Sequence, residues 1–526
     1  MQRVRLISPY LREQGIEAEV LCVEPDQVAA PQDSWLAAGL PQNVLVHRVK
    51  ALDLKWGKLP GLGTLTFRAL GALRRRGDEL LGRKVESGKL KAERGDQRAE
   101  FDLVYFSTTQ FGVHGLGPRW KKKFGVPFVM DYQDPWVSDY YREHPEVVPP
   151  GGRLKYGLAS WINRRQEPRV LRECSGITSV SAAYPEQLVR RYGGEEIGKQ
   201  KVESRGARWT GAIRDVPGQG PAGGRDQSGN GEKENAGEDC AQFQLSTFRF
   251  PLWSSSLFST VLPFPGDARD FERVRQEGIR QSVFDPNDGL KHWVYVGRGG
   301  ADMALAVRAL FCALANEMQR AKSIEQKRRD VAAAPSSDPM PHALCPSPPN
   351  PMPHAPCLSL SNLRLHFIGT SYAGAGQGMK TIEPLAREFG LEGIVSEHPD
   401  RIPYSETLRC LLDADTLIIP GSDDPGYTAS KIYPYLLAEK PLLAVFHEQS
   451  SVVDLIRKVG GGTVISFATG EAPNAIAARI ASEWLAVGGP EHAVSLDQTA
   501  FAPYTAMAQA ANLADLWHRC LIARSS

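Results

Sequence analysis

Runs of apolar residues alternate with longer stretches of mixed polarity along most of the chain. Thr416–Pro420 shows no polar alternation, which is typical of a strand buried on both faces. Further strands are predicted at Leu103–Phe106, Ile177–Val180 and Leu363–Ile368. Helical patterns, such as Tyr404–Ala414, lie between these runs. Strands that alternate with helices predict parallel sheets of doubly wound topology. We therefore expect an α/β fold.

Two stretches break this pattern. Residues 194–247 are rich in Gly, Gln, Asn and charge, and residues 322–361 contain the near repeat PMPHALC and PMPHAPC. Segments with so few apolar residues cannot bury a core, so both are predicted to be disordered insertions. The doubled H-x-x-C spacing of the second stretch matches zinc ligands, but a duplicated Pro-rich tract explains it more simply. No metal site is predicted.

The rest of the chain divides into two domains of the same design. We expect an N-terminal Rossmann-like domain in residues 1–193, a linker in 248–289, a C-terminal Rossmann-like domain in 290–500 and a C-terminal helix in 501–526. The length of 526 residues supports this, because it exceeds what one hydrophobic core ordinarily holds. Two such domains joined by a linker predict a cleft between them.

Composition narrows the class of protein. Apolar residues make up 42% of the chain and charged residues 23%, which are globular values, and the net charge of +2 gives no reason to expect nucleic acid as a partner. No apolar run reaches about 18 residues, so no transmembrane helix is expected. The eight scattered cysteines predict a reducing, cytoplasmic location. The basic stretch 68–98 is expected to be a solvated helical face, with weak attraction to anionic lipid as the alternative.

The chain begins with a helical pattern. Val4, Ile7 and Leu11 recur at helical spacing, Gly15 closes the helix, and a strand follows at once. An α/β domain normally begins with a strand. We therefore expect that a first strand and its glycine-rich loop are missing, either because the start is misassigned or because the protein lacks them.

The stretch with the clearest chemistry runs from Asp415 to Ser450. An apolar strand leads into a loop that contains Asp423 and Asp424, and a short helix follows. We expect Ser430 to be the N-cap of this helix, and Lys431 to add a positive charge at its start. A strand, a loop and a cationic helix N-terminus together predict a site for a phosphate or another anion.

Further residues of the C-terminal domain are candidates for the same site. Gly297 and Arg298 follow a predicted strand, and an arginine can clamp a diphosphate with two parallel hydrogen bonds. A surface arginine in a tight glycine turn is the alternative. Asp423 and Asp424 either bind sugar hydroxyls or make turns. Tyr427 lies in the same loop and completes the set of residues that we predict to bind a ligand at this site.

The N-terminal domain offers acidic and aromatic candidates. Asp131 ends a predicted strand, and Asp134 and Trp136 follow it. A carboxylate there could orient a hydroxyl nucleophile, and Trp136 could stack on a sugar; the alternative is that Asp134 caps a helix or turn. His114 is either a general base or a structural residue. We predict Asp134 and His114 as catalytic residues, and Asp131 and Trp136 as acceptor-side residues.

Four motifs together resemble a known family. They are KKKFGVPFVMDYQDPW, GITSVSAAYPEQL, WVYVGRGGAD and YTASKIYPYLLAEKPLLAVF. In this order and spacing they are similar to segments of the glycosyltransferases with two Rossmann domains, the GT-B class of group 1. The resemblance covers most of residues 1–193 and 290–480.

The resemblance implies a nucleotide-diphospho-sugar donor in the C-terminal domain and an acceptor in the N-terminal one. It also implies that no metal or cofactor is required, and that Arg298 and Lys431 hold the diphosphate. The chain departs from the family pattern at the paired glutamates, because Gly426 and Pro434 stand near their positions. No lysine follows Arg298 as it does in the family, which puts donor contacts in doubt.

The sequence therefore predicts a cytoplasmic glycosyltransferase, at the inner face of the membrane if the basic stretch binds lipid. It would move a sugar to a hydroxyl of a glycan or a lipid-linked acceptor, in cell-surface glycan synthesis. Two alternatives remain open. One is a truncated, non-catalytic relative, and the other is an epimerase of the same architecture that acts on the nucleotide sugar itself.

Overall fold

The computed structural model describes residues 2–28, 32–53, 64–83, 100–143, 149, 152–202, 243–250, 257–333, 362–371, 376–427, 429–492 and 494–525. The chain forms two compact units. Unit 1 comprises Met1–Pro9, Glu19–Leu73 and Pro263–Gln509, and unit 2 comprises Tyr10–Ala18, Arg74–Leu262 and Ala510–Ser526. Each unit contains a six-stranded sheet. The predicted α/β fold with two Rossmann-like domains is therefore confirmed, while the cleft between them stays a prediction.

The sheet of unit 1 has the strand order of a Rossmann fold. Its strands are parallel and run β11-β10-β9-β12-β13-β14, which is third, second, first, fourth, fifth and sixth along the chain. The order reverses between β9 and β12, and such sheets bind ligands at the carboxyl ends of the strands at this switch point. The strands are β9 (Lys291–Val296), β10 (Leu363–Ile368), β11 (Val395–His398), β12 (Thr416–Pro420), β13 (Leu442–His447) and β14 (Thr463–Phe467).

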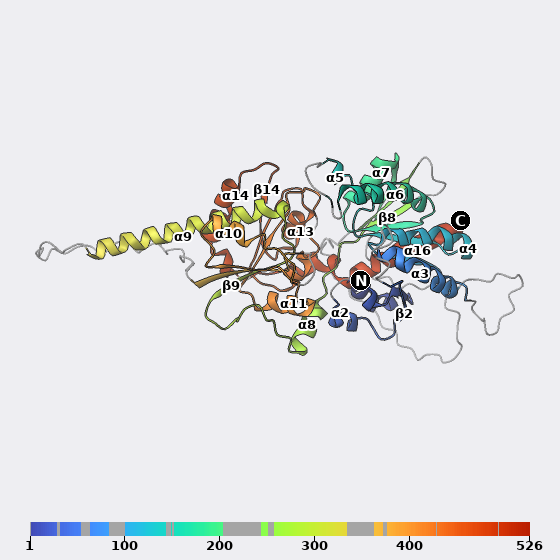
Figure 1. Cartoon of the computed structure of the whole chain (residues 1–526), viewed down its shortest axis with the longest axis horizontal. Helices are drawn as coiled ribbons and strands as arrows, with labels where there is room; N and C mark the ends of the chain where they lie inside the picture. Colours follow the sequence, from blue (N-terminus) through green and yellow to red (C-terminus); the bar gives the residue numbers. More distant parts are fainter. Residues whose placement is uncertain are drawn as a thin grey trace, which may run out of the picture. The chain divides into compact units, whose positions relative to one another are not determined.

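Helices cover both faces of this sheet. Figure 1 shows α9 and α14 on one side of β9, and α8 and α11 on the other. α9 continues into the stretch predicted to be a disordered insertion, because its helical pattern persists to Ala333; residues 334–361, with the doubled H-x-x-C, lie outside the described residues. The helices are α8 (Ala268–Gln276), α9 (Ala304–Ala333), α10 (Glu383–Glu388), α11 (Tyr404–Asp413), α12 (Ile432–Leu437), α13 (Ser451–Val459), α14 (Pro473–Ile480) and α15 (Gln498–Phe501).

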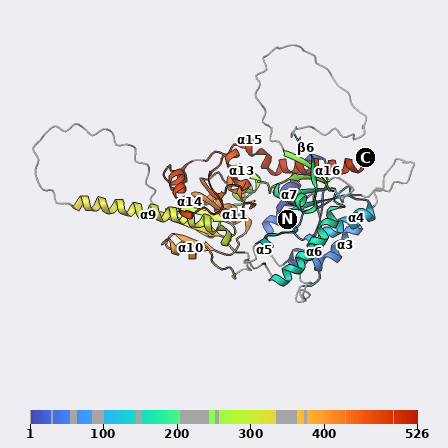
Figure 2. The same cartoon turned by 90° about the horizontal axis from the view of Figure 1, so that it is seen from above.

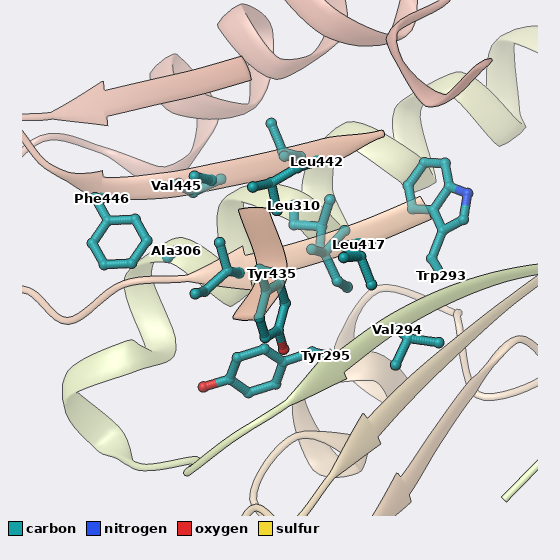
Figure 3. Packing of buried hydrophobic residues seen from close by; sticks show 14 of the residues in the cluster. Trp293, Val294, Tyr295, Ala306, Leu310, Leu417, Tyr435, Leu442, Val445 and Phe446 are labelled. Carbon is teal, nitrogen blue, oxygen red and sulfur yellow. The ribbon is translucent and has the colours of Figure 1, made fainter. Parts of the chain in front are cut away.

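The core of unit 1 forms where these helices meet the sheet (Figure 3). Every residue of β12 and of β13 is buried, as the absence of alternation predicts. Each large apolar side chain buried in this way contributes roughly 1.5–3 kcal/mol relative to an exposed one. Figure 3 labels Trp293, Val294, Tyr295, Ala306, Leu310, Leu417, Tyr435, Leu442, Val445 and Phe446 from this cluster.

A tyrosine from α12 lies at the switch point itself. β9 and β12 pair only at Trp293 and Val294. Beyond them, the Val296 N–H donates to the Tyr435 hydroxyl at 2.6 Å, and that hydroxyl donates to the Val296 carbonyl at 3.1 Å. The hydroxyl thus replaces strand-to-strand hydrogen bonds that buried backbone groups would otherwise lack. The two strands can therefore separate at the edge where a ligand would bind.

The sheet of unit 2 is mostly parallel. Strands β3, β4, β5 and β8 are parallel; β7 pairs antiparallel with β8, and β6 pairs antiparallel with β7 at the edge of the sheet. Figure 1 shows α6 and α7 above β8, and α4 and α16 below it. The elements are β3 (Val104–Phe106), α4 (Leu116–Phe124), β4 (Phe128–Tyr132), α5 (Tyr140–Glu143), α6 (Arg153–Leu171), β5 (Gly176–Ser179), α7 (Ala183–Tyr192), β6 (Glu195–Val202), β7 (Phe243–Arg249) and β8 (Leu257–Val261).

Strands β6, β7 and β8 correct the sequence prediction. β6 and β7 form the two ends of the stretch 194–247, and residues 203–242 between them lie outside the described residues. β8 and α8 lie in the stretch predicted to be a linker. The strands are stabilised because Leu245, Phe248 and Leu257 are buried in the sheet. The pattern was obscured because a polar, glycine-rich segment separates β6 from its partner.

The ends of the chain add further elements. α1 (Gln2–Leu11) is helical as predicted and contains Pro9. The parallel pair β1 (Glu19–Val23) and β2 (Leu45–Val49) groups with unit 1, and the missing first strand stays a prediction. The last helix, α16 (Ala506–Ser525), packs Leu516 and Cys520 against the unit 2 core. Two more helices are α2 (Ser34–Ala38) and α3 (Leu65–Leu81).

Two absences concern only the described residues. No helix among them is long and apolar enough to cross a membrane. They also contain no group of three or more His, Cys, Asp and Glu side chains that could hold a metal ion. The basic stretch 68–98 is helical in its first part, within α3, and residues 84–99 lie outside the described residues.

Candidate functional site

Two cationic side chains meet at the switch point of unit 1. Gly297 and Arg298 directly follow β9, and Lys431 directly precedes α12. The Lys431 ammonium lies so close to Gly297 that a Cβ on this glycine would stand 2.0 Å from Nζ. Real Cβ contacts do not occur at that distance, so Lys431 can occupy this position only because residue 297 has no side chain.

Arg298 is held in place by an ion pair and an aromatic ring. Its guanidinium donates to both carboxylate oxygens of Asp302, at 2.8 and 2.6 Å, and lies 4.8 Å from the ring centroid of Tyr427. Burial opposes the charge of Arg298, but the hydrogen bonds to Asp302 outweigh it and raise the arginine pKa above its usual value. The pKa of Asp302 is lowered, because the hydrogen bonds from Arg298 and Ser422 exceed the effect of burial. Arg298 thus stays charged at any physiological pH.

The positive charge of Lys431 has weaker partners than the positive charge of Arg298. Its Nζ donates to the Tyr295 hydroxyl at 2.5 Å and lies 4.5 Å from that ring centroid, and the hydroxyl donates onward to the Arg298 carbonyl. Burial, and then the nearby charge of Arg298, lower the pKa of Lys431 to about 7, although Asp302 acts in the opposite direction. A bound anion would supply the missing negative charge and raise this pKa again.

The helix start differs from the prediction. α12 begins at Ile432, Lys431 occupies the N-cap position, and no side chain caps the helix. The predicted N-cap role of Ser430 is therefore wrong, and its side chain is exposed one residue earlier. A helix of six residues also has a small dipole. The positive charge of the site comes from the side chains of Arg298 and Lys431.

The remaining donor-side candidates shape the loop after β12. Asp424 accepts a hydrogen bond from the Gly426 N–H at 2.8 Å, which is the turn alternative considered for it. Asp423 is exposed, and its N–H donates to the Asp302 carbonyl at 2.8 Å. Tyr427 stacks on Phe446 with ring centroids 6.4 Å apart. These contacts hold the loop beside Arg298.

In unit 2, Asp131 is the penultimate residue of β4 and is buried. Its carboxylate accepts hydrogen bonds from Ser107 at 3.0 Å, from Thr178 at 2.8 Å and from the Gln133 side chain at 2.7 Å. Buried carboxylates need such partners to offset lost hydration. Asp131 therefore joins the ends of neighbouring strands, and its predicted acceptor-side role stays a prediction.

His114 and Trp136 lie inside the unit. Both are buried, and the Trp136 ring is stacked on Phe111 and contacts His114 at 5.2 Å between centroids. Neither ring nitrogen of His114 has a hydrogen-bond partner among the described residues, and burial lowers its pKa to about 4. A general base must reach the proton that it takes, and a stacking platform must be exposed. Burial therefore favours the structural alternative for His114, because this aromatic cluster packs both rings away from solvent, and the roles of His114 and Trp136 at the site stay predictions.

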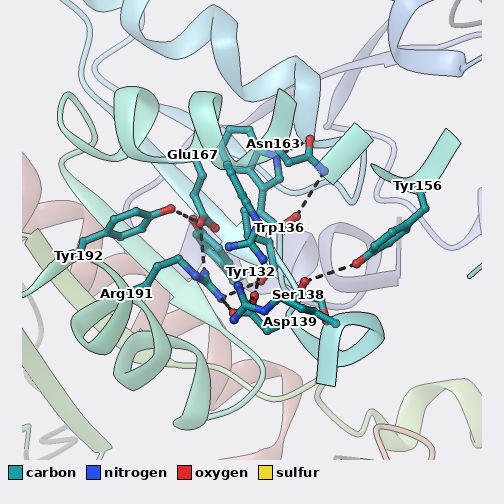
Figure 4. A network of polar contacts seen from close by, with 12 residues as sticks. Tyr132, Trp136, Ser138, Asp139, Tyr156, Asn163, Glu167, Arg191 and Tyr192 are labelled. Atoms are coloured by element: carbon teal, nitrogen blue, oxygen red, sulfur yellow. Dashed lines mark hydrogen bonds and ion pairs between the residues drawn. The ribbon is translucent and has the colours of Figure 1, made fainter. Parts of the chain in front are cut away.

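Asp134 is the exposed carboxylate of this region. Its surroundings partly desolvate it and raise its pKa. The loop that carries it is anchored by Arg191 of α7, which donates to the Val137 carbonyl at 3.1 Å and to Asp139 at 3.3 Å (Figure 4). The loop geometry thus depends on a buried network behind it.

Glu167 of α6 is the centre of that network, and sequence reasoning missed its role. It is fully buried and accepts hydrogen bonds from Tyr192 at 2.5 Å, from Tyr132 at 3.3 Å and from Arg191 at 3.3 Å (Figure 4). Burial raises the Glu167 pKa, and the hydrogen bond from Tyr192 is the largest effect opposing it. A single acidic residue inside a basic helix is the only signal that could have found it.

A comparison of sequences shows what the N-terminal part of the chain resembles. Residues 2–198 match the model of the glycosyl transferase 4-like domain. This part of the chain is similar to that family. The predicted resemblance to glycosyltransferases is thereby confirmed. The glycosyl transferase 4-like domain contains His114, Asp131, Asp134 and Trp136, whereas the cationic pair of unit 1 lies outside the matched residues.

Solved structures with a similar course of chain are remote in sequence. HepE of Anabaena, solved in complex with UDP, is 13% identical, with 98% of this chain and 95% of that chain covered and a TM-score of 0.46. A UDP-forming α,α-trehalose-phosphate synthase of Burkholderia xenovorans is 11% identical, with 97% and 100% covered and a TM-score of 0.47. A glycosyltransferase of Rickettsia africae is 10% identical, with 99% and 94% covered and a TM-score of 0.47. No curated protein sequence matches the chain.

Proposed function

We propose that the chain is a glycosyltransferase that moves a sugar from a nucleotide-diphospho-sugar to a hydroxyl group of a glycan or lipid-linked acceptor, in cell-surface glycan synthesis. The family of residues 2–198 supports the reaction class. One observation carries the choice of donor. Arg298 and Lys431 converge at the carboxyl end of β9, at the switch point of a Rossmann sheet, where nucleotides bind in this fold.

The chemistry of the pair suits a leaving diphosphate. An arginine fork and a lysine point charge can neutralise phosphate oxygens without a metal ion. Arg298 already pairs with Asp302, so an arriving diphosphate would share the guanidinium with this carboxylate. The hydrogen bond that Lys431 donates goes to a phenol hydroxyl, and no carboxylate among the described residues accepts one from it. Lys431 is therefore the side chain that a bound anion would stabilise most.

On the acceptor side, Asp134 is the remaining candidate for a catalytic residue. It is exposed, and its raised pKa increases its basicity. A carboxylate with these properties can accept a proton from, or orient, an acceptor hydroxyl.

A second candidate is a relative that binds a nucleotide sugar without transferring the sugar. The burial of His114 and the saturated hydrogen bonding of Asp131 favour it, because both remove a group that could act on an acceptor. A product assay with a nucleotide-sugar donor separates the two, since the binding relative would leave the donor intact. An epimerase would instead change the donor in the absence of any acceptor.

The donor proposal is tested by replacing Lys431 with methionine. A panel of nucleotide sugars, with UDP-glucose as the first probe, should stabilise the wild type by about 2.7 kcal/mol at a ligand concentration of about 100 Kd. Lys431→Met should weaken this binding by about 100-fold, since a charge-assisted hydrogen bond is lost, and calorimetry measures the change. Lys440→Met is the matched control, because Lys440 is another partly buried lysine whose pKa burial lowers, and it lies outside the site.

The same variant should remain folded. The Lys431 pKa is lowered from 10.5 to about 7, so the unfolded chain binds more protons than the folded chain between these values. Stability is therefore lost as the pH falls from 10.5 to about 7, and methionine removes that loss. We expect Lys431→Met to be more stable than the wild type at about pH 7, by on the order of 1 kcal/mol. Unchanged donor affinity in this stable variant would overturn the proposed role.

A further inference from the structure

Helix α6 carries an unusual outward face. Leu154 is 91% exposed, Leu158 59% and Trp161 53%. These residues are spaced by four and three positions, so they lie on one side of the helix. Figure 2 shows α6 at the lower margin of unit 2. Exposed large apolar residues are ordinary when they are scattered, but a contiguous row marks a surface that contacts something else.

The same face becomes basic in the second half of the helix. Arg165, Arg169 and Arg172 continue the spacing of four and three residues and are exposed. None of the three forms an ion pair among the described residues. The Arg165 guanidinium lies 4.0 Å from the ring centroid of Trp161, where the apolar half meets the basic half.

Among the described residues of α6 and the turn that follows it, no acidic side chain lies unpaired on this face. The acidic residue within α6 is Glu167, which is buried on the opposite side and bound to Arg191. Glu173, just past the helix, pairs with Lys121. The outward face thus presents apolar side chains, an interfacial tryptophan and a row of positive charges. We call Leu154, Leu158, Trp161, Arg165, Arg169 and Arg172 the α6 face.

We propose that the α6 face docks on an anionic phospholipid surface. Leucine and tryptophan side chains enter the boundary between headgroups and acyl chains, and arginines bind the headgroups beside them. A tryptophan between the two halves suits this boundary, because its ring has an apolar body and a polar N–H. The proposal is independent of the proposed donor and acceptor.

A second copy of the chain fits the α6 face less well. In a two-fold contact the same patch meets itself. Antiparallel helices would place the apolar half of one copy on the arginines of the other, and parallel helices would oppose arginine to arginine. Both arrangements bury charge without a partner. An anionic membrane surface avoids this cost, since its headgroups lie beside its apolar interior.

Vesicle flotation tests the proposal with the full-length protein. The wild type should float with vesicles of phosphatidylcholine and phosphatidylglycerol, and stay in the unbound fraction when the vesicles contain phosphatidylcholine alone. The double variants Leu158→Ser/Trp161→Ser and Arg165→Glu/Arg169→Glu should each reduce the bound fraction by about tenfold or more. High salt should weaken binding of the wild type.

Matched controls use equally exposed residues elsewhere. Met379→Ser changes an apolar residue that is 80% exposed, and Arg320→Glu reverses an exposed charge on α9. Both should bind as the wild type does. Melting curves of all variants should agree, because every substitution is at the surface.

Two results would overturn the proposal. One is that the wild type does not bind anionic vesicles, or that both α6 double variants bind as well as the controls. The other comes from light scattering: if the wild type is a dimer that both α6 variants convert to monomers, and vesicle binding is unchanged, the α6 face is a contact between copies.

Discussion

Buried charged side chains in the two units differ in how many hydrogen-bond partners they have. In unit 2, Asp131 and Glu167 each accept three hydrogen bonds from named partners. In unit 1, Lys431 donates to a single phenol hydroxyl and has a pKa lowered to about 7. A charged side chain with all its hydrogen bonds made stabilises the fold and positions the chain. A charged side chain with few partners can instead gain binding energy from a ligand of opposite charge. The difference separates the residues that hold the fold from the residues that would hold a ligand.

The largest expected effect breaks the network of unit 2. Glu167→Ala removes the carboxylate that the Arg191 guanidinium and the Tyr132 and Tyr192 hydroxyls share, although Arg191 keeps its contacts with Asp139 and the Val137 carbonyl. Removing one partner from a buried ion pair costs about 3–5 kcal/mol, which denaturant unfolding measures. Glu388→Ala is the matched control, because its ion pair with Arg308 is exposed and should leave stability close to that of the wild type. A small loss for Glu167→Ala would mean that the network does not hold the loop of Asp134.

The next effect concerns donor binding in unit 1. In Gly297→Ala, the new Cβ would stand 2.0 Å from the Lys431 ammonium, which is the end of a flexible side chain, and 2.8 and 2.9 Å from Oη and Cζ of Tyr295. We expect donor affinity to fall by roughly tenfold or more, since the loss of one charge-assisted hydrogen bond costs about 1.5–3 kcal/mol. We also expect a lower melting temperature, because Tyr295 is buried and its ring must shift. Gly393→Ala is the control, because a Cβ there meets no atom within 4 Å. Equal affinities of the two variants would show that Lys431 need not approach residue 297.

The smallest expected effect is a pH dependence. Lys431 is charged below its pKa of about 7 and loses its proton as the pH rises. Affinity for UDP-glucose, whose diphosphate does not titrate in this range, should therefore fall by about tenfold between about pH 6.5 and about pH 8.5. Lys431→Met should abolish this dependence. A slope of the opposite sign, or the same slope in the variant, would contradict the assignment of the titrating group.

The sequence predicted well those elements whose own residues decide them. β12 and β13 are apolar at nearly every position, and a buried parallel strand needs little else to be recognised. β6 and β7 were missed because each depends on pairing with a strand that is distant along the chain, across a polar segment. Arg298 and Lys431 were singled out because a charged residue next to a predicted strand end or helix start is visible locally.

Burial and backbone geometry are the properties that could not be predicted for individual site candidates. Ser430 has the composition of an N-cap, but the backbone turns into α12 one residue later, at Lys431. His114 and Trp136 have the chemistry of site residues, but aromatic packing with Phe111 covers them. Side-chain chemistry can be read from a sequence, whereas exposure depends on neighbours that are distant along the chain.

The sequence by itself determined the two Rossmann-like units and the approximate place of the cationic pair, because hydrophobic runs and strand-end residues are local features. Only the tertiary structure decided that the absence of a side chain at Gly297 leaves space for Lys431. It also decided that Glu167 accepts hydrogen bonds from Arg191 and two tyrosines, and that one face of α6 is exposed. Each of these depends on which distant groups meet, and therefore on packing, burial and the balance of charge.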